Sequence, residues 1–232
     1  MRAPRLPAAI LVAALLAGGA VGCSHRAAAQ PQPTGATTPG LVAQAAPSPT
    51  ASPLPSGADG VKRVFPVVGK VSYGHSHHDY PATDIITACG NKVVAAISGT
   101  VLATVREDTW TAKANLGATR GGLSVSILGD DGVRYYGSHM RKILDNIQPG
   151  VRVTAGEQLG EIGDTGDASA CHLHFGISPP CQQTGDWWIA RGVIWPWSYL
   201  DSWKAGGNKS PVAEIAAWQK ANGCPTKPLV DP

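Results

Sequence analysis

The chain has 232 residues and a formal net charge of +3, and only 15% of its residues are charged. A balance so close to neutral, without a basic patch, argues against a nucleic-acid partner. The length is sufficient for one main folded domain together with terminal segments.

Residues 1–22 have the features of a secretion signal. Arg2 and Arg5 form a basic start, and residues 6–22 are apolar or small but contain proline and glycine. Such a run falls short of the ~20 apolar residues that a membrane-spanning helix needs. It ends in Gly-Ala-Val-Gly-Cys23, which resembles the bacterial lipobox, whose cysteine is acylated. We therefore expect export and a lipid anchor at Cys23 on the outer face of the cytoplasmic membrane, with ordinary secretion as the alternative.

Residues 23–60 are almost wholly Ala, Pro, Thr, Ser, Gly and Gln. They contain too few large apolar residues to bury a core, so we expect a disordered tether. From residue 61 onward, β-branched runs alternate with Gly, Asp and Pro. These runs are Arg63–Val68, Lys92–Ile97, Thr100–Val105, Leu123–Leu128, Val133–Tyr136, Gln158–Ile162 and Leu173–Ile177.

Seven short strands and no long amphipathic helix predict an all-β domain over residues 61–205. Asp130-Asp131-Gly132 predicts a hairpin turn between two of the strands. Within residues 206–232 we expect one short helix, which begins near Ser210 and Pro211 and ends at Asn222-Gly223.

Four cysteines follow Cys23, and an even number in an exported protein favours disulfides. Of the three possible pairings we favour Cys171–Cys181 with Cys89–Cys224, because the first closes a short loop. A thiolate zinc site is the alternative, but no Cys-x-x-Cys spacing supports it. Six of the seven tryptophans lie between positions 187 and 218, where they either line a groove or cover one edge of a small barrel.

Six of the seven histidines lie in three separate islands, and each island stands at the end of a strand-like run. The islands are residues 73–85, 135–140 and 171–176. The pair His172 and His174 would place both imidazoles on one face of a strand, since strand side chains alternate. A further histidine and an aspartate from another strand could complete a zinc site with one open position, which is typical of catalytic zinc.

The order and flanking residues of these islands resemble the lysostaphin/LytM-type zinc metallopeptidases of bacterial cell walls. The H-x3-D element of that family appears here in a longer form, His78-Asp-Tyr-Pro-Ala-Thr-Asp84. Its Tyr-x-His-Leu element corresponds to Tyr136-Gly-Ser-His139-Met140, and a glycine-punctuated run leads into His172-Leu-His174-Phe. The resemblance covers about residues 62–182 and implies an open, largely antiparallel β-sheet with a zinc ion in a groove across it.

The resemblance further implies that Asp84 and His174 bind one zinc ion per chain together with one histidine of the first island. We choose His78, with His77 as the alternative. His139 and His172 would flank the metal without binding it. Zinc held by two imidazoles and a carboxylate activates water near neutral pH. We assign the general base to His172 and the oxyanion donor to His139, with the reverse assignment left open, and Tyr73 as a further donor.

The function implied by the resemblance is that of an endopeptidase cutting stem peptides or cross-bridges of peptidoglycan. Some relatives have lost ligands and regulate other wall hydrolases without catalysis, which is the first alternative. A lipoprotein that binds zinc or wall polymer without cutting it is the second alternative. The additional residues His75 and His77 favour this last interpretation, because they could shift the metal.

Overall fold

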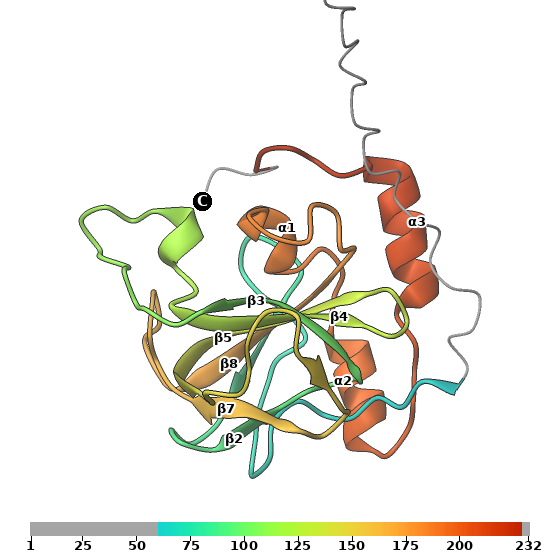
Figure 1. Cartoon of the computed structure of the whole chain (residues 1–232), viewed down its shortest axis with the longest axis horizontal. Coiled ribbons are helices and arrows are strands. Elements are labelled where there is room, and N and C mark those ends of the chain that lie inside the picture. Colours follow the sequence, from blue (N-terminus) through green and yellow to red (C-terminus); the bar gives the residue numbers. More distant parts are fainter. Residues whose placement is uncertain (1–59, 229–232) are drawn as a thin grey trace, which may run out of the picture. The chain divides into compact units, whose positions relative to one another are not determined.

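The computed structural model describes residues 60–228 (Figure 1). The predicted signal segment, the anchor at Cys23 and nearly all of the predicted tether lie outside the described residues. Among residues 60–228, no helix has the length and apolarity needed to cross a bilayer.

Eight strands form one sheet, and every strand pairing in it is antiparallel. Six strands follow the order β1-β8-β5-β4-β3-β6, while β2 pairs with β7, which also pairs with β5. The strands are β1 (Thr83–Ile86), β2 (Lys92–Val94), β3 (Gly99–Val105), β4 (Leu123–Gly129), β5 (Arg134–Ile143), β6 (Arg152–Val153), β7 (Gln158–Ile162) and β8 (His172–Ser178).

The predicted open, largely antiparallel sheet is confirmed, and six of the seven predicted runs overlap strands. The seventh run, Arg63–Val68, makes only isolated bridges, from Arg63 to Ile97 and from Val67 to Val93. The predicted turn at Asp130-Asp131-Gly132 joins β4 to β5, and Gly132 adopts φ of 77° there, a conformation that glycine tolerates best. β1 and β6 were not predicted, because both are short and polar at half of their positions.

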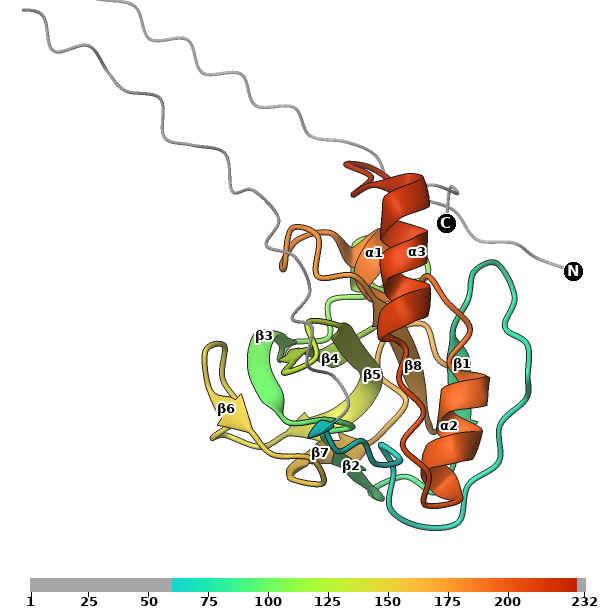
Figure 2. The same ribbon diagram turned by 90° about the vertical axis from the view of Figure 1, so that its right-hand side faces the viewer.

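Within the described part of the chain, one short helix interrupts the strands, and three others follow them in the sequence. They are η2 (Gly117–Thr119), which lies between β3 and β4, and then α1 (Trp187–Ala190), α2 (Trp197–Lys204) and α3 (Val212–Asn222). α3 confirms the predicted C-terminal helix, with Pro211 before its first residue and Gly223 after its last. Figure 2 shows α2 and α3 beside β8 and β1, with β6 on the opposite side of the sheet.

The core is centred on β8, all seven residues of which are buried. β1 and β5 flank β8 in the sheet, and α2 supplies Trp203, whose ring lies 6.2 Å from that of Phe175. A strand covered on both faces buries its polar residues as well. His172 and His174 are therefore held inside the fold, where burying them requires hydrogen-bond partners.

Two buried ion pairs tie distant segments together. Arg63 lies 2.7 Å from Asp131, and Asp131 also accepts a hydrogen bond from the Tyr135 hydroxyl. Arg134 of β5 forms a two-pronged contact with Asp186, with distances of 2.6 Å and 3.1 Å. Because Asp186 immediately precedes α1, this second pair fixes the start of that helix against the sheet.

Two disulfides join Cys89 to Cys171 and Cys181 to Cys224, with Cα–Cα distances of 5.3 Å and 5.4 Å. The predicted pairing of Cys171–Cys181 with Cys89–Cys224 is therefore wrong. Between Cys171 and Cys181 the chain runs extended through β8 at about 3.3 Å per residue, which carries the two cysteines apart. The antiparallel partner of β8 ends opposite His172, so the chain that follows it brings Cys89 to Cys171.

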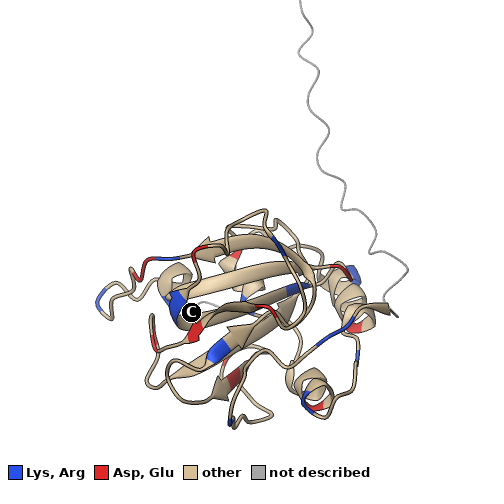
Figure 3. Cartoon of the chain, turned by 60° about the horizontal axis from the view of Figure 1, so that its bottom comes forward, with Lys and Arg blue, Asp and Glu red and all other residues tan. Residues whose placement is uncertain are grey.

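Charged residues are few and their signs are interspersed over the described chain (Figure 3). Several form exposed pairs, of which Arg152 and Asp130 are an example. The charges that matter for the site are the smaller number that lie inside or beside its pocket.

Candidate metal centre

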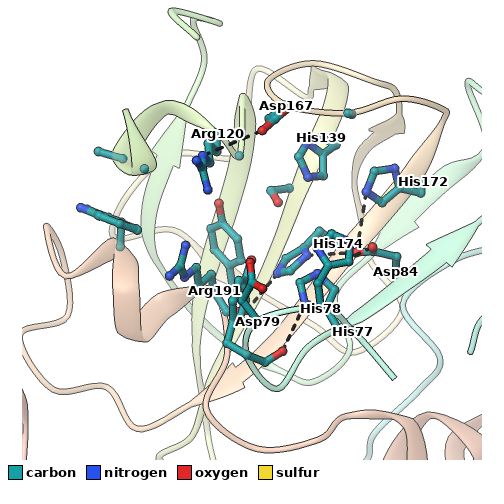
Figure 4. A pocket seen from close by; sticks show the side chains of 18 of the residues that line it. His77, His78, Asp79, Asp84, Arg120, His139, Asp167, His172, His174 and Arg191 are labelled. Atoms are coloured by element: carbon teal, nitrogen blue, oxygen red, sulfur yellow. Dashed lines mark hydrogen bonds and ion pairs between the residues drawn. The ribbon is translucent and has the colours of Figure 1, made fainter. Parts of the chain in front are cut away.

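Strand register brings residues from three parts of the sequence to one place. In the antiparallel β1–β8 pairing, Asp84 lies opposite His174, and Ile86 lies opposite His172. β5 pairs with the other edge of β8 and places Ser138 opposite His174, next to His139. Figure 4 shows the resulting cluster of histidines around Asp84. The sheet thus brings together Asp84, His139, His172 and His174, as the sequence predicted.

The backbone at His139 departs from regular strand geometry. His139 has φ of 64°, a left-handed conformation that is uncommon for a residue other than glycine. Its backbone N–H donates to the carbonyl of Gly121, and its ring centroid lies 4.5 Å from that of His172. Uncommon backbone conformations of this kind concentrate at functional sites.

Four histidines share one arrangement, in which one ring nitrogen faces a backbone carbonyl oxygen. The pairs are His77 with Tyr80 at 3.1 Å, His139 with Thr165 at 2.7 Å, His172 with Ala170 at 2.7 Å and His174 with Arg191 at 2.9 Å. A carbonyl oxygen only accepts, so each of these nitrogens carries the hydrogen. In the neutral ring the opposite nitrogen then presents a lone pair. Metal-binding histidines are commonly oriented in this way.

Three of those lone pairs point at the same carboxylate. Nδ1 of His174 lies 3.0 Å from Oδ1 of Asp84, Nε2 of His77 lies 3.7 Å from Oδ2, and Nε2 of His172 lies 3.7 Å from Oδ1. An imidazole lone pair and a carboxylate oxygen are both acceptors, so a proton or a metal ion between them makes their close approach favourable. Two imidazoles and one carboxylate are a ligand set typical of catalytic zinc. The residues present therefore fit a zinc ion.

The first island contributes two histidines beside the carboxylate. Ligand atoms of His77, His78 and Asp84 all lie within 4.8 Å of one another. His77 is almost completely buried, with 5% of its side chain exposed, and its Nδ1 is held by the Tyr80 carbonyl. His78 is exposed and its ring stacks on that of His77, with the centroids 4.6 Å apart.

His75 and Tyr73 lie in a different environment from the other residues of the first island. The His75 ring stacks on Trp197 at 4.3 Å, and its Nε2 lies 3.3 Å from Asp201 of α2. The Tyr73 hydroxyl, which was expected to serve as an oxyanion donor, donates instead to Asp201 at 2.7 Å. Neither residue lines the pocket, so these contacts attach the loop before β1 to α2.

Burial and neighbouring charges set the protonation of the cluster. Burial, reinforced by the charge of His174, lowers the pKa of His77 to about 4. Burial likewise lowers the pKa of His139 to about 4, despite the hydrogen bond to Thr165. Burial alone would raise the pKa of Asp84, but its contacts with His174, His77 and His172 bring it below the ordinary value. For His77 and His139, a neutral ring near an ionised carboxylate is the state that binds a metal.

A pocket of about 230 Å³ opens over this cluster. Its wall includes residues that the sequence analysis did not identify, namely Tyr80, Tyr136, Arg120 and Arg191, and one of the clustered tryptophans, Trp187. The Trp188 indole N–H donates instead to the Pro225 carbonyl, and the Trp197 ring stacks on that of His75. The expectation that tryptophans line a groove therefore holds for Trp187. Arg120 could have been suspected, because it ends a long irregular segment, whereas nothing in the sequence pattern marks Arg191.

Comparisons with known proteins bear on the same segment. Residues 78–185, just under half of the chain, match the family model described as Peptidase family M23. A comparison with curated proteins gives no match.

Solved structures that are similar to the chain include the catalytic domain of lysostaphin, an antimicrobial peptidase from Staphylococcus simulans. It is 23% identical with a TM-score of 0.44, and the alignment covers 57% of this chain and 93% of that one. A putative M23 peptidase from Pseudomonas aeruginosa is 22% identical with a TM-score of 0.45, covering 64% and 53%. A putative glycyl-glycine endopeptidase LytM from Ruminococcus gnavus is 22% identical with a TM-score of 0.45, covering 65% and 63%.

The chain spans only about half to two thirds of the length of the last two proteins. The family match rests on the sequence itself and includes Asp84, His139, His172 and His174. Residues 78–185 of this chain are therefore similar to Peptidase family M23.

Proposed function

We propose that the protein is a zinc-dependent endopeptidase that hydrolyses peptide bonds in bacterial peptidoglycan. The observation that carries the proposal is the convergence of imidazole lone pairs on Asp84, inside a pocket of a domain that is similar to Peptidase family M23. The similar chain from Staphylococcus simulans is named an antimicrobial peptidase, and the one from Ruminococcus gnavus a putative glycyl-glycine endopeptidase.

Asp84, His174 through Nδ1 and His77 through Nε2 are the ligands that we propose. The first two were predicted from the sequence. For the third, burial and the hydrogen bond to the Tyr80 carbonyl favour His77 over the exposed His78, because an oriented ring binds without further loss of side-chain freedom. Bound zinc would supply Lewis-acid activation of a water molecule and of the scissile carbonyl.

His172 is the proposed general base. Its Nδ1–H is held by the Ala170 carbonyl, so Nε2 presents its lone pair on the side of Asp84, at 3.7 Å. A ring held in this tautomer can take a proton from the attacking water and release it to the leaving amine. No rotation of the ring is needed between the two steps.

His139 lies beside His172, with the two ring centroids 4.5 Å apart. Its Nδ1–H is held by Thr165, so its Nε2 is also an acceptor in the neutral state, which the lowered pKa of about 4 maintains. His139 can therefore donate to a developing oxyanion only after a proton has reached Nε2. The reverse assignment of the two histidines is tested by comparing the pH–rate profiles of His172→Ala and His139→Ala.

The metal is tested on four alanine variants of the full-length protein. Asp84→Ala, His174→Ala and His77→Ala should lose most of the one zinc ion bound per chain, measured by atomic emission after dialysis, because a site with three protein ligands has none to spare. His78→Ala is the matched control and should keep its zinc. Loss of zinc in His78→Ala with retention in His77→Ala would reverse the choice between the two histidines.

Catalysis is tested by digestion of purified peptidoglycan by the zinc-loaded protein, followed by mass analysis of the fragments. New peptide termini that appear with the wild type and not with Asp84→Ala would support the endopeptidase. Zinc binding without any cleavage would refute it and would favour a protein that binds wall polymer or regulates other hydrolases.

We also propose that the protein is an exported lipoprotein anchored through Cys23. The sequence Gly-Ala-Val-Gly-Cys23 after an apolar run supports this, and residues 23–60 have the composition of a flexible tether. A coil of that length reaches on the order of 35 Å, which would confine cleavage to wall material near the membrane. Cys23→Ser should remove an acyl mass from the mature N-terminus, and an unacylated wild-type protein in the medium would contradict the anchor.

A further inference from the structure

Arg191 lies in the pocket wall between two aromatic rings. Its guanidinium carbon is 4.1 Å from the ring centroid of Tyr80 and 4.8 Å from that of Trp187. Figure 4 shows Arg191 and Arg120 on one side of the pocket, with Asp84 and His172 on the other. Stacking on aromatic faces holds a guanidinium in a fixed plane without using its N–H donors.

The Arg191 donors remain available within the described part of the chain. Arg191 has no carboxylate within 4 Å among residues 60–228, although Asp79 also lines the pocket. Its Nε is buried without a hydrogen-bond partner there. A half-buried cation that lacks a charged partner is costly, and a carboxylate that reaches the terminal nitrogens of the guanidinium from the pocket would offset that cost.

Arg120 adds a second positive charge to the same wall. Among the described residues, its ion-pair partner is Asp167, whose carboxylate lies 3.8 Å from Nε. Both side chains are partly open to solvent, so this pair is not buried. Its Nε also donates to the side-chain oxygen of Asn115. Such a solvent-accessible ion pair contributes little to folding stability, so Arg120 can turn away from Asp167 toward a ligand.

The position of Arg191 is fixed relative to the candidate metal. Its backbone carbonyl accepts the Nε2–H of His174, so the guanidinium belongs to a residue that touches a proposed zinc ligand. Asp186, which precedes α1, is held by the buried Arg134. The short helix that carries Trp187 and leads to Arg191 is therefore anchored at its start.

We propose that Arg191, assisted by Arg120, binds a carboxylate of the substrate, so that the enzyme selects peptides with a free carboxylate near the scissile amide. The proposal rests on the proposed endopeptidase function and names its substrate class. An arginine fork matches a carboxylate through two parallel hydrogen bonds, which a carboxamide cannot reproduce. The carboxylate is either the C-terminal group of the peptide or an acidic side chain.

The test measures binding without hydrolysis, so that its failure is distinct from a failure of the proposed function. Metal-free full-length protein is titrated calorimetrically with two pairs of synthetic peptides. One pair differs only in a C-terminal carboxylate against a carboxamide, and the other only in an internal glutamate against glutamine. We expect one free carboxylate to strengthen binding by about ten-fold, as for a charge-assisted hydrogen bond. The pair that shows the preference identifies the source of the carboxylate.

Arg191→Gln should abolish that preference, and Arg191→Lys should retain only part of it, because lysine keeps the charge but not the fork. Arg120→Gln should reduce it and serves as a second variant if Arg191→Gln folds poorly. Arg152→Gln is the matched control: it removes the same charge from an exposed pair outside the pocket and should leave the preference intact. Equal binding within both peptide pairs, or a preference that survives in Arg191→Gln and Arg120→Gln, would overturn the proposal.

Discussion

The buried pair of Arg134 and Asp186 offers a stringent test of how the pocket wall is held. Both side chains are at most 1% exposed, and Arg134 also donates to Ser178 of β8. In Asp186→Asn the arginine keeps its charge but loses the carboxylate that compensates it. Breaking a buried pair by changing one partner costs about 3–5 kcal/mol, most of it from the uncompensated charge.

That free energy corresponds to a measurable shift in melting temperature. With about 2.1 cal/mol/K per residue over about 170 residues, the unfolding entropy is roughly 0.36 kcal/mol/K, so a loss of about 4 kcal/mol lowers Tm by about 11 °C. Urea unfolding at pH 7 with intact disulfides should show a lower midpoint with an unchanged m-value. Because Asp186 precedes α1, the same variant should also weaken the carboxylate preference proposed for Arg191.

The exposed pair of Arg152 and Asp130 is the matched control. It has similar geometry, with distances of 2.5 Å and 2.9 Å, but its side chains are 61% and 38% exposed. Asp130→Asn should leave Tm nearly unchanged, because exposed pairs are screened by solvent. If Asp186→Asn destabilised the protein no more than Asp130→Asn does, the inference that Arg134 and Asp186 anchor α1 would be refuted.

Three further outcomes are expected. His172→Ala and His139→Ala should keep zinc yet lose about 100-fold or more of the peptidase rate, as for removal of a positioned proton carrier or donor; loss of zinc would instead show that either residue is a ligand. In the metal-free protein, burial lowers the pKa values of His77 and His139 to about 4, so both residues bind protons more readily in the unfolded state. The free energy of unfolding should therefore fall as the pH drops from about 6.5 to 4, by up to roughly 1.4 kcal/mol per pH unit for each histidine. Urea midpoints that are independent of pH across that window would contradict the neutral state of these two rings. Peptide mapping without reduction should recover Cys89 linked to Cys171, and a Cys171–Cys181 peptide would contradict the observed pairing.

The sheet could be predicted from the sequence because its longer strands carry the alternation and the turn residues that define them. β4 and β5, joined by Asp130-Asp131-Gly132, are an example. What could not be predicted was the pairing of strands that lie far apart in the sequence. The disulfide prediction failed for this reason, since Cys89 meets Cys171 only through the antiparallel pairing of β1 with β8. Spacing along the chain does not show which of the distant strands are neighbours.

The pocket wall was missed for a related reason. Arg191 follows a helix of four residues, which is too short to show a helical period, and its aromatic neighbours Tyr80 and Trp187 come from different parts of the chain. The signal that could have drawn attention to it was a lone arginine within the tryptophan-rich segment. A single residue has no periodicity from which its position could be predicted. Its stacking on Tyr80 and Trp187 beside the candidate metal site is seen only in the folded structure.

The candidate ligands divide in the same way between strand and loop. Asp84 and His174 lie opposite each other in paired strands. Side chains alternate between the two faces of a strand, so the same regular spacing that is visible in the sequence also determines the face on which each of these side chains lies. The third candidate ligand comes from the loop before β1, where no such rule applies and counting residues toward Asp84 favours His78. In the structure the carbonyl of Tyr80 orients His77 and leaves its neighbour in solvent. The hydrogen bond between His77 and the Tyr80 carbonyl thus favours His77 as the candidate ligand, and a change that removes this loop conformation should affect zinc affinity more than a change at His78 itself.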